Sequence, residues 1–527
     1  MSTAKPSSSR PNFLFIMADQ MAGPALSING HRVVKTPHIE SLAASGVTFR
    51  NAYCNNPICA SSRFSMMAGQ LPSRIGAYDN AAEFPAAVPT FAHYLRHLGY
   101  RTCLSGKMHF VGPDQLHGFE QRVTTDIYPS DFGWTPDWTA QGYPFAPSVM
   151  SLRGVVESGL CVRAMQIDYD EEVQHCATRK LHDFARERTD RPFFLAVSFT
   201  HPHNPFTITE EYWNRYRDDD IDMPSVPHIP VEERDPWSRR YYYLIRQDEH
   251  EVTDEIVRRT RRAYYGMISY VDDKVGELLG TLEALGIADN TVVVFTADHG
   301  DMMGERGMWY KFNPFEWSTR IPFVVRAPGN AAGRVEDGNG SLLDLLPTFL
   351  DLATDGAPPE LADAIDGHSL VPMLHGRDES WPNEALIEFT AEGTYAPCLI
   401  LRKGRYKYVY CETDPGMLFD LEADPGETRN LCEEPAHADV AAEMLRDILS
   451  RWDPPALKRQ ILESQRRRRF VQRVLLEGER SPWDYRPVTD PSRQYVRSSV
   501  NTSTTLTKGL ARYPYMEPVE PDFPRDS

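Results

Sequence analysis

The sequence lacks any apolar run long enough to cross a membrane, which takes about 20 consecutive apolar residues. Residues 1–11 are polar, and the apolar run that follows them is too short for the core of a signal peptide. We therefore expect neither a transmembrane anchor nor a secretory leader, and we expect the protein in the cytoplasm.

Cysteines are few and show no regular framework. The eight are Cys54, Cys59, Cys103, Cys161, Cys176, Cys398, Cys411 and Cys432. No two of them form a C-x-x-C pair of the kind that binds zinc or carries a redox disulfide. In a chain of 527 residues this usage fits mostly free thiols in a reducing compartment.

Positive charge is also in short supply. The 56 Lys and Arg residues face 74 Asp and Glu residues, which gives a net charge of −18. This balance argues against a general nucleic-acid or anionic-membrane binder. The one conspicuous basic cluster, Arg466 to Arg469, is expected on a solvated or inter-subunit helix face, with an anion site as the alternative. An anionic substrate would therefore need positive charge concentrated locally.

Short apolar runs alternate with helical patterns along the first part of the chain. The runs are Phe13 to Gln20, Phe193 to His203, Val292 to Asp301 and Pro322 to Gly329, and helical patterns include Val88 to Leu98 and Thr260 to Leu285. Such alternation predicts an α/β fold with a largely parallel sheet covered on both faces. Ligands bind beyond the carboxyl ends of such strands, where Asp19, His203, Asp298 and His299 fall.

The composition changes near Trp381. Strand-turn-strand patterns with Asp-Pro-Gly turns predict a smaller α+β unit, and from about Asp453 a basic helix leads into a Pro-, Ser- and Thr-rich tail. We expect a catalytic domain over 1–378, a subdomain over 379–455, and a helix and tail over 456–527. The tail would wrap the main body or a neighbouring subunit. The Pro- and charge-rich residues 221–251 are expected to form a surface insertion.

Two acidic pairs close predicted strands. Asp19 with Gln20, and Asp298 with His299, together offer three oxygen-bearing groups and one imidazole. This set suits a divalent ion such as Ca²⁺ or Mn²⁺ better than a structural zinc ion. Either pair alone would fit a helix cap or a turn equally well.

A set of cationic and imidazole groups accompanies these pairs. Lys107 and His109 are two residues apart, so in an extended or turn segment they point the same way. A Lys and a His that converge can neutralise an oxyanion and protonate a leaving group. His201, His203 and Lys311 extend the set. Taken singly, each His could equally be structural.

With these motifs assembled, the stretch around Cys59 resembles the signature of the type I sulfatases. Cys59-x-Ser61-x-Arg63 is followed by "MMAGQLPSR", and the acidic pairs, "GKMH", "PHNP" and Lys311 with Glu316, Arg320 and Pro322 match family motifs in order. The resemblance implies an alkaline-phosphatase-like α/β sandwich with a largely parallel sheet. It also implies oxidation of Cys59 to formylglycine, whose hydrate attacks sulfur and then releases sulfate by breakdown of a hemiacetal.

The resemblance also implies roles for single residues. Asp19, Gln20, Asp298, His299 and one oxygen of the modified Cys59 would bind one divalent metal ion, with Ca²⁺ first and Mn²⁺ or Mg²⁺ as alternatives. Arg63 would hold the hydrate, Lys107 and Lys311 would bind sulfate oxygens, His109 would act as a general base, and His203 would lie at the leaving group.

Several segments resemble the choline-sulfatase group of this family, among them "TTDIYPSDFGWTPDW", "TAEGTYAP" and "SPWDYRPV". The substrate-binding residues implied are Asn80, Trp134, His201, Glu392, Met150 and Ser151. The pattern departs from the group at three places. Ser61 replaces the usual Pro or Ala, Met150 and Ser151 replace His-Asn, and Ser503 stands near an expected Asp.

These departures leave the substrate open. Choline-O-sulfate is the first candidate, and another small or aryl sulfate ester is the second. A phosphonate monoester or phosphodiester hydrolase, and a catalytically impaired binding homologue, remain as alternatives. The implied partners are a formylglycine-generating enzyme and further copies of this chain in a homodimer or homotetramer; neither nucleic acid nor a membrane is expected.

Overall fold

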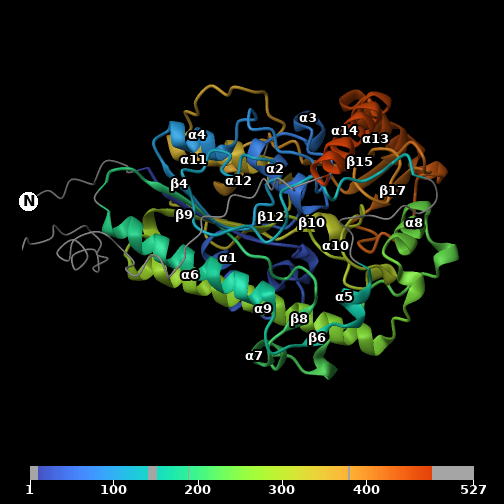
Figure 1. Ribbon diagram of the computed structural model, residues 1–527, viewed down its shortest axis with the longest axis horizontal. Coiled ribbons are helices and arrows are strands. Elements are labelled where there is room, and N and C mark those ends of the chain that lie inside the picture. The colour runs from blue at the N-terminus through green and yellow to red at the C-terminus, as the bar shows by residue number, and fades with distance from the viewer. Residues whose placement is uncertain (1–9, 141–150, 188, 378–379, 478–527) are drawn as a thin grey trace, which may run out of the picture.

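The four apolar runs of the sequence all form strands of one eight-stranded sheet (Figure 1). The computed structural model describes residues 10–140, 151–187, 189–377 and 380–477. The strands of the main sheet, in spatial order, are β12 (Arg334–Glu336), β2 (Val47–Phe49), β11 (Phe323–Arg326), β9 (Thr291–Ala297), β1 (Asn12–Ala18), β7 (Phe193–Ser198), β4 (Arg101–Gly106) and β5 (Gln121–Arg122). All neighbouring pairs are parallel except the two that β11 makes.

Helices cover both faces of this sheet, as the continuous apolar strands predict. The α-helices of the whole described chain are α1 (Pro37–Ser45), α2 (Cys59–Ala68), α3 (Pro72–Ile75), α4 (Phe91–His97), α5 (Arg153–Val156), α6 (Met165–Arg186), α7 (Glu210–Trp213), α8 (Pro236–Leu244), α9 (Asp254–Ala284), α10 (Glu316–Thr319), α11 (Leu345–Thr354), α12 (Val371–Leu374), α13 (Ala438–Arg451) and α14 (Pro454–Leu475). Figure 1 shows α6 and α9 along one face and α4 and α11 on the other. None of the described helices has the length and apolar character needed to cross a membrane.

Three smaller sheets complete the fold. They contain β10 (Arg320–Ile321), β3 (Ala52–Tyr53) and β13 (Gly340–Ser341); β6 (Gly159–Leu160) and β8 (Thr207–Ile208); and the antiparallel β14 (Glu384–Phe389), β15 (Cys398–Lys403), β16 (Tyr406–Cys411) and β17 (Met417–Asp420). Ile400 of β15 packs into the main core, whereas Leu399 and Leu401 face α13 and α14. Both hydrophobic clusters contain residues from either side of 378, and the second also contains residues from either side of 455, so these expected boundaries stay predictions.

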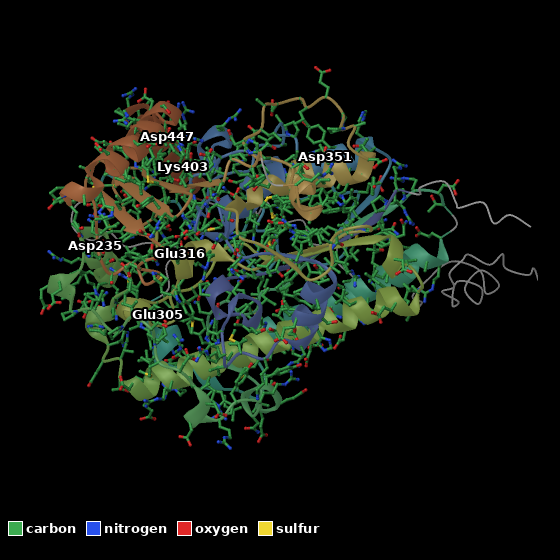
Figure 2. All side chains as sticks on the ribbon, turned by 180° about the vertical axis from the view of Figure 1, so that it is seen from behind. Asp235, Glu305, Glu316, Asp351, Lys403 and Asp447 are labelled. Atoms are coloured by element: carbon green, nitrogen blue, oxygen red, sulfur yellow. The ribbon has the colours of Figure 1, made fainter. Side chains whose placement is uncertain are left out.

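Ion pairs fasten the four-stranded sheet on both sides. Lys403 of β15 contacts Asp447 of α13 at 2.6 Å, at the outer edge of the molecule (Figure 2). On the inner side, Lys407 of β16 is fully buried between Glu316, at 3.0 Å, and Glu427. The sheet is therefore joined to the main body by a buried charge cluster as well as by apolar packing.

Two expectations need correction. Residues 221–251 are not only a surface insertion, because Trp237 in α8 is 2% exposed and packs against Phe389, with ring centroids 5.0 Å apart. The basic cluster on α14 is not a uniformly solvated face either. Arg468 is buried, although Arg466, Arg467 and Arg469 are exposed.

Candidate active site

Four neighbouring parallel strands end at one edge of the main sheet, and polar residues follow each of them. The order β9-β1-β7-β4 places Asp298 after β9, Asp19 after β1, His203 beyond β7, and Lys107 after β4. Because carboxyl ends of parallel strands share one edge, side chains far apart in the sequence meet there.

The side chains of Asp19, Cys59, Asp298 and His299 form a buried cluster of potential metal ligands. One donor atom from each lies within 4.8 Å of the others, and no residue is more than 2% exposed. His299 Nδ1 lies 3.0 Å from the carbonyl oxygen of Gly300, so Nε2 faces Cys59 Sγ at 3.2 Å. Carboxylate oxygens with one imidazole nitrogen fit a divalent cation.

Gln20 is oriented from several directions. Its backbone N–H donates to Asp298 Oδ1 (3.0 Å), and its amide nitrogen donates to Asn204 Oδ1 (3.1 Å) and Asp301 Oδ2 (2.5 Å). The amide oxygen is thereby left for Lys311 Nζ, which donates to it at 2.5 Å. The orienting residues Asn204 and Asp301 were not predicted as site residues, although Asn204 lies within "PHNP" and Asp301 lies two residues after His299.

Two cations neutralise the carboxylates from the protein side. Arg63 Nε donates to Asp298 Oδ2 (2.8 Å), and its guanidinium also donates to the carbonyl oxygen of Lys107 (2.6 Å). The ammonium group of Lys107 binds Asp19 Oδ2. Burial lowers the pKa of Lys107, but Asp19, Cys59 and Asp298 together outweigh burial and raise it. Both residues therefore remain cationic although they are fully buried.

Cys59 opens α2 and lies at the centre of these charges. Burial raises the pKa of its thiol, but Lys107, Lys311 and His299 outweigh burial and hold the pKa well below its usual range. Lys311 Nζ lies 3.6 Å from the sulfur. A cysteine at a helix start surrounded by cations is a reactive residue rather than an inert core thiol.

Aromatic rings form a wall beside the cations. The ring of Tyr128 has its centroid 5.3 Å from His109 and 5.6 Å from Trp134. Lys107 Nζ lies 4.2 Å from the centroid of the Tyr128 ring, and the Tyr128 hydroxyl is 3.1 Å from His203 Nδ1. This aromatic wall therefore contacts two imidazoles and one of the buried cations.

Sequence reasoning missed Tyr128 and the neighbouring Asp126. The Asp126 carboxylate accepts the backbone N–H groups of Met108 (3.0 Å) and His109 (2.8 Å), which fixes the segment after β4. Burial raises the pKa of Asp126, but Arg122 and His109 outweigh it and bring the pKa to about 2. The signal lay in "TTDIYPSDFGW", but nothing in its spacing links it to Lys107 and His109.

Of the remaining predicted residues, Asn80 contacts the segment of Cys59, whereas the side chain of His201 contacts other residues. Asn80 accepts the backbone N–H of Ala60 at 3.0 Å, so it contacts the start of α2. His201 Nδ1 lies 2.6 Å from Asp170, and its ring packs against Tyr270, so its side chain is engaged outside the thiol cluster.

Two further predicted positions are Glu392 and Ser151. Glu392 is buried in the loop between β14 and β15. Ser151 accepts a hydrogen bond from the Tyr310 hydroxyl through its carbonyl oxygen (3.1 Å). Met150 and Ser503 lie outside the described residues.

Three family models match successive parts of the chain. The sulfatase model matches residues 11–356, the model of the N-sulphoglucosamine sulphohydrolase C-terminal region matches 304–452, and the choline sulfatase enzyme C-terminal model matches 459–513.

Similar proteins extend these matches. A choline-sulfatase of Rhizobium meliloti (strain 1021) is 45% identical over 511 residues, covering 96% of this chain and 99% of the relative. An arylsulfatase of Clostridium perfringens (strain 13 / Type A) is 28% identical, covering 84% of this chain and 94% of the relative. The structure of a phosphonate monoester hydrolase of Agrobacterium radiobacter superimposes with a TM-score of 0.68 at 26% identity, covering 86% of this chain and 96% of the other.

Proposed function

The chain belongs to the sulfatase family and is a sulfate ester hydrolase, and we propose that its substrate is a small alkyl sulfate, with choline-O-sulfate as the first candidate. The observation that carries this proposal is the position of the aromatic wall, Tyr128 and Trp134, beside the buried cations around Cys59. Choline-O-sulfate carries an anionic sulfate at one end and a quaternary ammonium at the other. Fixed cations suit the first, and aromatic faces suit the second.

A divalent cation belongs to this proposal. Asp19, Gln20, Asp298 and His299 would hold it, with Ca²⁺ first and Mn²⁺ or Mg²⁺ as alternatives. When bound, such an ion supplies Lewis-acid stabilisation of charge on the sulfuryl oxygens.

Cys59 is proposed as the site of formylglycine formation, which requires a formylglycine-generating enzyme. The aldehyde hydrate formed there supplies a nucleophile and an oxygen ligand that a thiol cannot supply. The surroundings of the sulfur fit this group, because Asp19 Oδ1 at 3.7 Å, His299 Nε2 at 3.2 Å and Lys311 Nζ at 3.6 Å all converge on it.

Different side chains of the chain would then bind the sulfate group, orient the carboxylates and transfer protons. Lys107 and Lys311 bind the sulfuryl oxygens and offset their charge, and Arg63 fixes the two carboxylates. His109 acts as a general base. Burial and Lys311 lower the pKa of His203, which keeps it neutral until a bound anion favours its protonated form beside the leaving oxygen.

Asn80 and Trp134 are proposed to contact the substrate, as are Glu392, Ser151 and Met150, while His201 orients the segment after β7. A second substrate class follows from the departures at Met150, Ser151 and Ser503. Their replacement of the usual pocket residues favours another small or aryl sulfate ester. The similarity to a phosphonate monoester hydrolase structure keeps that activity as a further candidate.

Localisation and assembly are part of the same proposal. We infer a cytoplasmic protein, because none of the eight cysteines forms a disulfide and six of the eight are buried. We also propose three units, over 1–378, 379–455 and 456–527. The last unit would contact neighbouring copies in a homodimer or homotetramer.

Comparison of three substrates tests the proposal. The protein is co-expressed with a formylglycine-generating enzyme, and kcat/KM is measured for choline-O-sulfate, an aryl sulfate and an aryl phosphonate monoester. The proposal expects choline-O-sulfate to have the largest value. A larger value for the aryl sulfate would shift the substrate class, and a larger value for the phosphonate would overturn the choice of a sulfate ester.

A further inference from the structure

The C-terminal helix α14 turns one polar face toward the main body. Gln465 is 2% exposed and Arg468 is 6% exposed, and they lie three residues apart on one side of the helix. Polar residues at this spacing share a helix face. Figure 1 shows α14 next to α13, at the end of the molecule that holds the four-stranded sheet.

Arg468 makes a two-point contact with Asp79. Its two terminal nitrogens donate to Asp79 Oδ1 at 2.6 Å and Oδ2 at 2.7 Å, and one of them also donates to Thr135 Oγ1 at 3.3 Å. Asp79 is fully buried, and its carboxylate also accepts the N–H of Ala81 at 3.0 Å. A planar guanidinium fork on a carboxylate fixes orientation as well as charge.

The residue after Asp79 reaches the reactive centre. Asn80 Oδ1 accepts the N–H of Ala60, the residue after Cys59. Because the amide oxygen must be the acceptor there, the amide nitrogen faces the other way. It donates no hydrogen bond within the described part of the chain, and Asn80 is 4% exposed. A donor held in this way beside Cys59 is available to an anionic substrate.

The same helix face holds a second loop. Gln465 Oε1 accepts the backbone N–H of Trp138 at 3.0 Å, and the Trp138 indole donates to the carbonyl oxygen of Ala391 at 2.8 Å. Trp134 and Glu392 lie in these two braced segments. The face therefore braces the loops that carry three of the residues proposed to contact substrate.

A buried ion pair is by itself a weak source of stability, because desolvation offsets much of the attraction. The Arg468–Asp79 pair instead fixes the orientation of the loop that carries Asn80. We propose that Arg468 is a positioning residue that acts through Asp79 to hold the Asn80 amide toward the sulfate group of the substrate. This inference rests on the proposed function, and it gives α14 a part in substrate binding.

The test compares Arg468→Met with Arg467→Met in converted protein, using the sulfate ester that the wild type turns over. Arg467 is exposed and pairs with Glu463 of its own helix, so its substitution serves as the matched control. Loss of one hydrogen bond to a charged group corresponds to about 10- to 100-fold in kcat/KM. We expect a loss of that size for Arg468→Met, mainly as a higher KM, and less than about 2-fold for the control.

A double-mutant cycle separates positioning from general destabilisation. If Arg468 acts through Asn80, the pair Arg468→Met with Asn80→Ala should lose no more activity than Asn80→Ala alone. Multiplying losses, or an unchanged KM in Arg468→Met, would overturn the inference. Should Arg468→Met not fold, as judged by thermal unfolding, Arg468→Lys replaces it in the same cycle, since it keeps the charge without the two-point contact. A wild type without sulfate ester turnover would instead refute the proposed function, and the inference with it.

Discussion

Tyr128 links the groups on both sides of the candidate site. Its ring lies over Lys107, and its hydroxyl is 3.1 Å from His203 Nδ1. Burial raises the pKa of Tyr128 well above its usual range, so the hydroxyl stays neutral. His203 Nδ1–H donates to the carbonyl oxygen of Asn204 at 2.6 Å, and the Tyr128 hydroxyl is a second acceptor that helps to hold the imidazole in one orientation. The contact of the ring with Lys107 and the contact of the hydroxyl with His203 can therefore be tested separately.

The substitution Tyr128→Phe tests the hydroxyl alone. Because the ring remains, we expect KM to change little and kcat to fall by about 3- to 10-fold, the cost of one hydrogen bond. Steady-state kinetics with the preferred sulfate ester measures both constants. Tyr410→Phe, a partly exposed position in β16, is the control. An unchanged kcat for Tyr128→Phe would show that His203 does not depend on this hydroxyl.

At the residue level, the sequence predicted the groups that strand topology brings together. Asp19 and Asp298 follow apolar strands directly, so their meeting at one sheet edge follows from a general rule of parallel sheets. Tyr128 and Asp126 could not be predicted in this way. Their positions depend on the path of a loop, and no local periodicity encodes that path.

Among the elements, the contact between the four-stranded sheet and the main body includes one fully buried cation, Lys407. Lys407 lies between Glu316 and Glu427, and all three are nearly or fully buried. The position of Glu316 near the middle of the molecule can be followed in Figure 2. Removal of the lysine would take from the buried Glu427 its ion-pair partner and leave Glu316 with Arg320 at 3.6 Å.

We predict that Lys407→Met lowers the free energy of unfolding by about 3–5 kcal/mol, the typical effect of removing one partner of a buried ion pair. Lys403→Met is the matched control, because its partner Asp447 is also partly exposed and such a pair contributes at most about 1 kcal/mol. Denaturant unfolding of both variants measures the difference. Equal effects would contradict a special role for the buried cluster.

Glu388 of β14 contacts residues of two other segments, and its titration makes the free energy of unfolding depend on pH. Its carboxyl accepts the N–H of Ser73 (2.7 Å) and the indole N–H of Trp452 (2.6 Å), and burial raises its pKa to about 7. A folded-state pKa above the unfolded value of about 4.5 means that the folded protein binds the proton more tightly. Its stabilising contribution is fully present below pH 4.5 and is lost as the pH rises through 7.

We therefore expect the free energy of unfolding of the wild type to fall, relative to Glu388→Gln, between pH 5 and pH 8. The full difference between the two limits is about 3 kcal/mol. Denaturant midpoints of both proteins at the two pH values provide the measurement. The comparison across pH cancels any constant cost of the substitution. Parallel pH profiles would refute the raised pKa.

The helices and strands were predicted better than their contacts. The run Val292 to Asp301 contains all of β9 except Thr291, and the pattern Thr260 to Leu285 largely coincides with α9. The basic run on α14 is an example of side-chain burial that the sequence pattern does not predict. A helix with four consecutive arginines looks solvated all round, and only the neighbouring Asp79 loop decides that Arg468 is buried.

For the whole molecule, the contrast between surface and site charge decides what can bind. The chain carries a net charge of −18, yet Arg63, Lys107 and Lys311 gather beside Cys59. Surface charges are screened beyond about 8 Å at physiological salt, whereas buried cations are not. A small anion that reaches the site therefore meets local positive charge.

Removal of the proposed cation should affect stability and activity together. A cation that binds only the folded protein stabilises it by up to about 4 kcal/mol at a thousandfold excess over its dissociation constant. We expect a chelator to lower the melting temperature and abolish turnover, and we expect added Ca²⁺ or Mn²⁺ to restore both. A melting temperature and turnover that both resist exhaustive chelation would argue against a metal at Asp19 and Asp298.

The central claim is that catalysis depends on converted Cys59. The most direct test measures turnover of choline-O-sulfate per protein molecule against the fraction of formylglycine, determined by mass spectrometry of the peptide that contains Cys59. Preparations with different levels of the generating enzyme supply the range, and Cys59→Ala supplies the zero point. We expect turnover to rise in proportion to the fraction of formylglycine, on a straight line through the origin, with no turnover in Cys59→Ala. Turnover that persists in protein carrying only the thiol, or in Cys59→Ala, would contradict it.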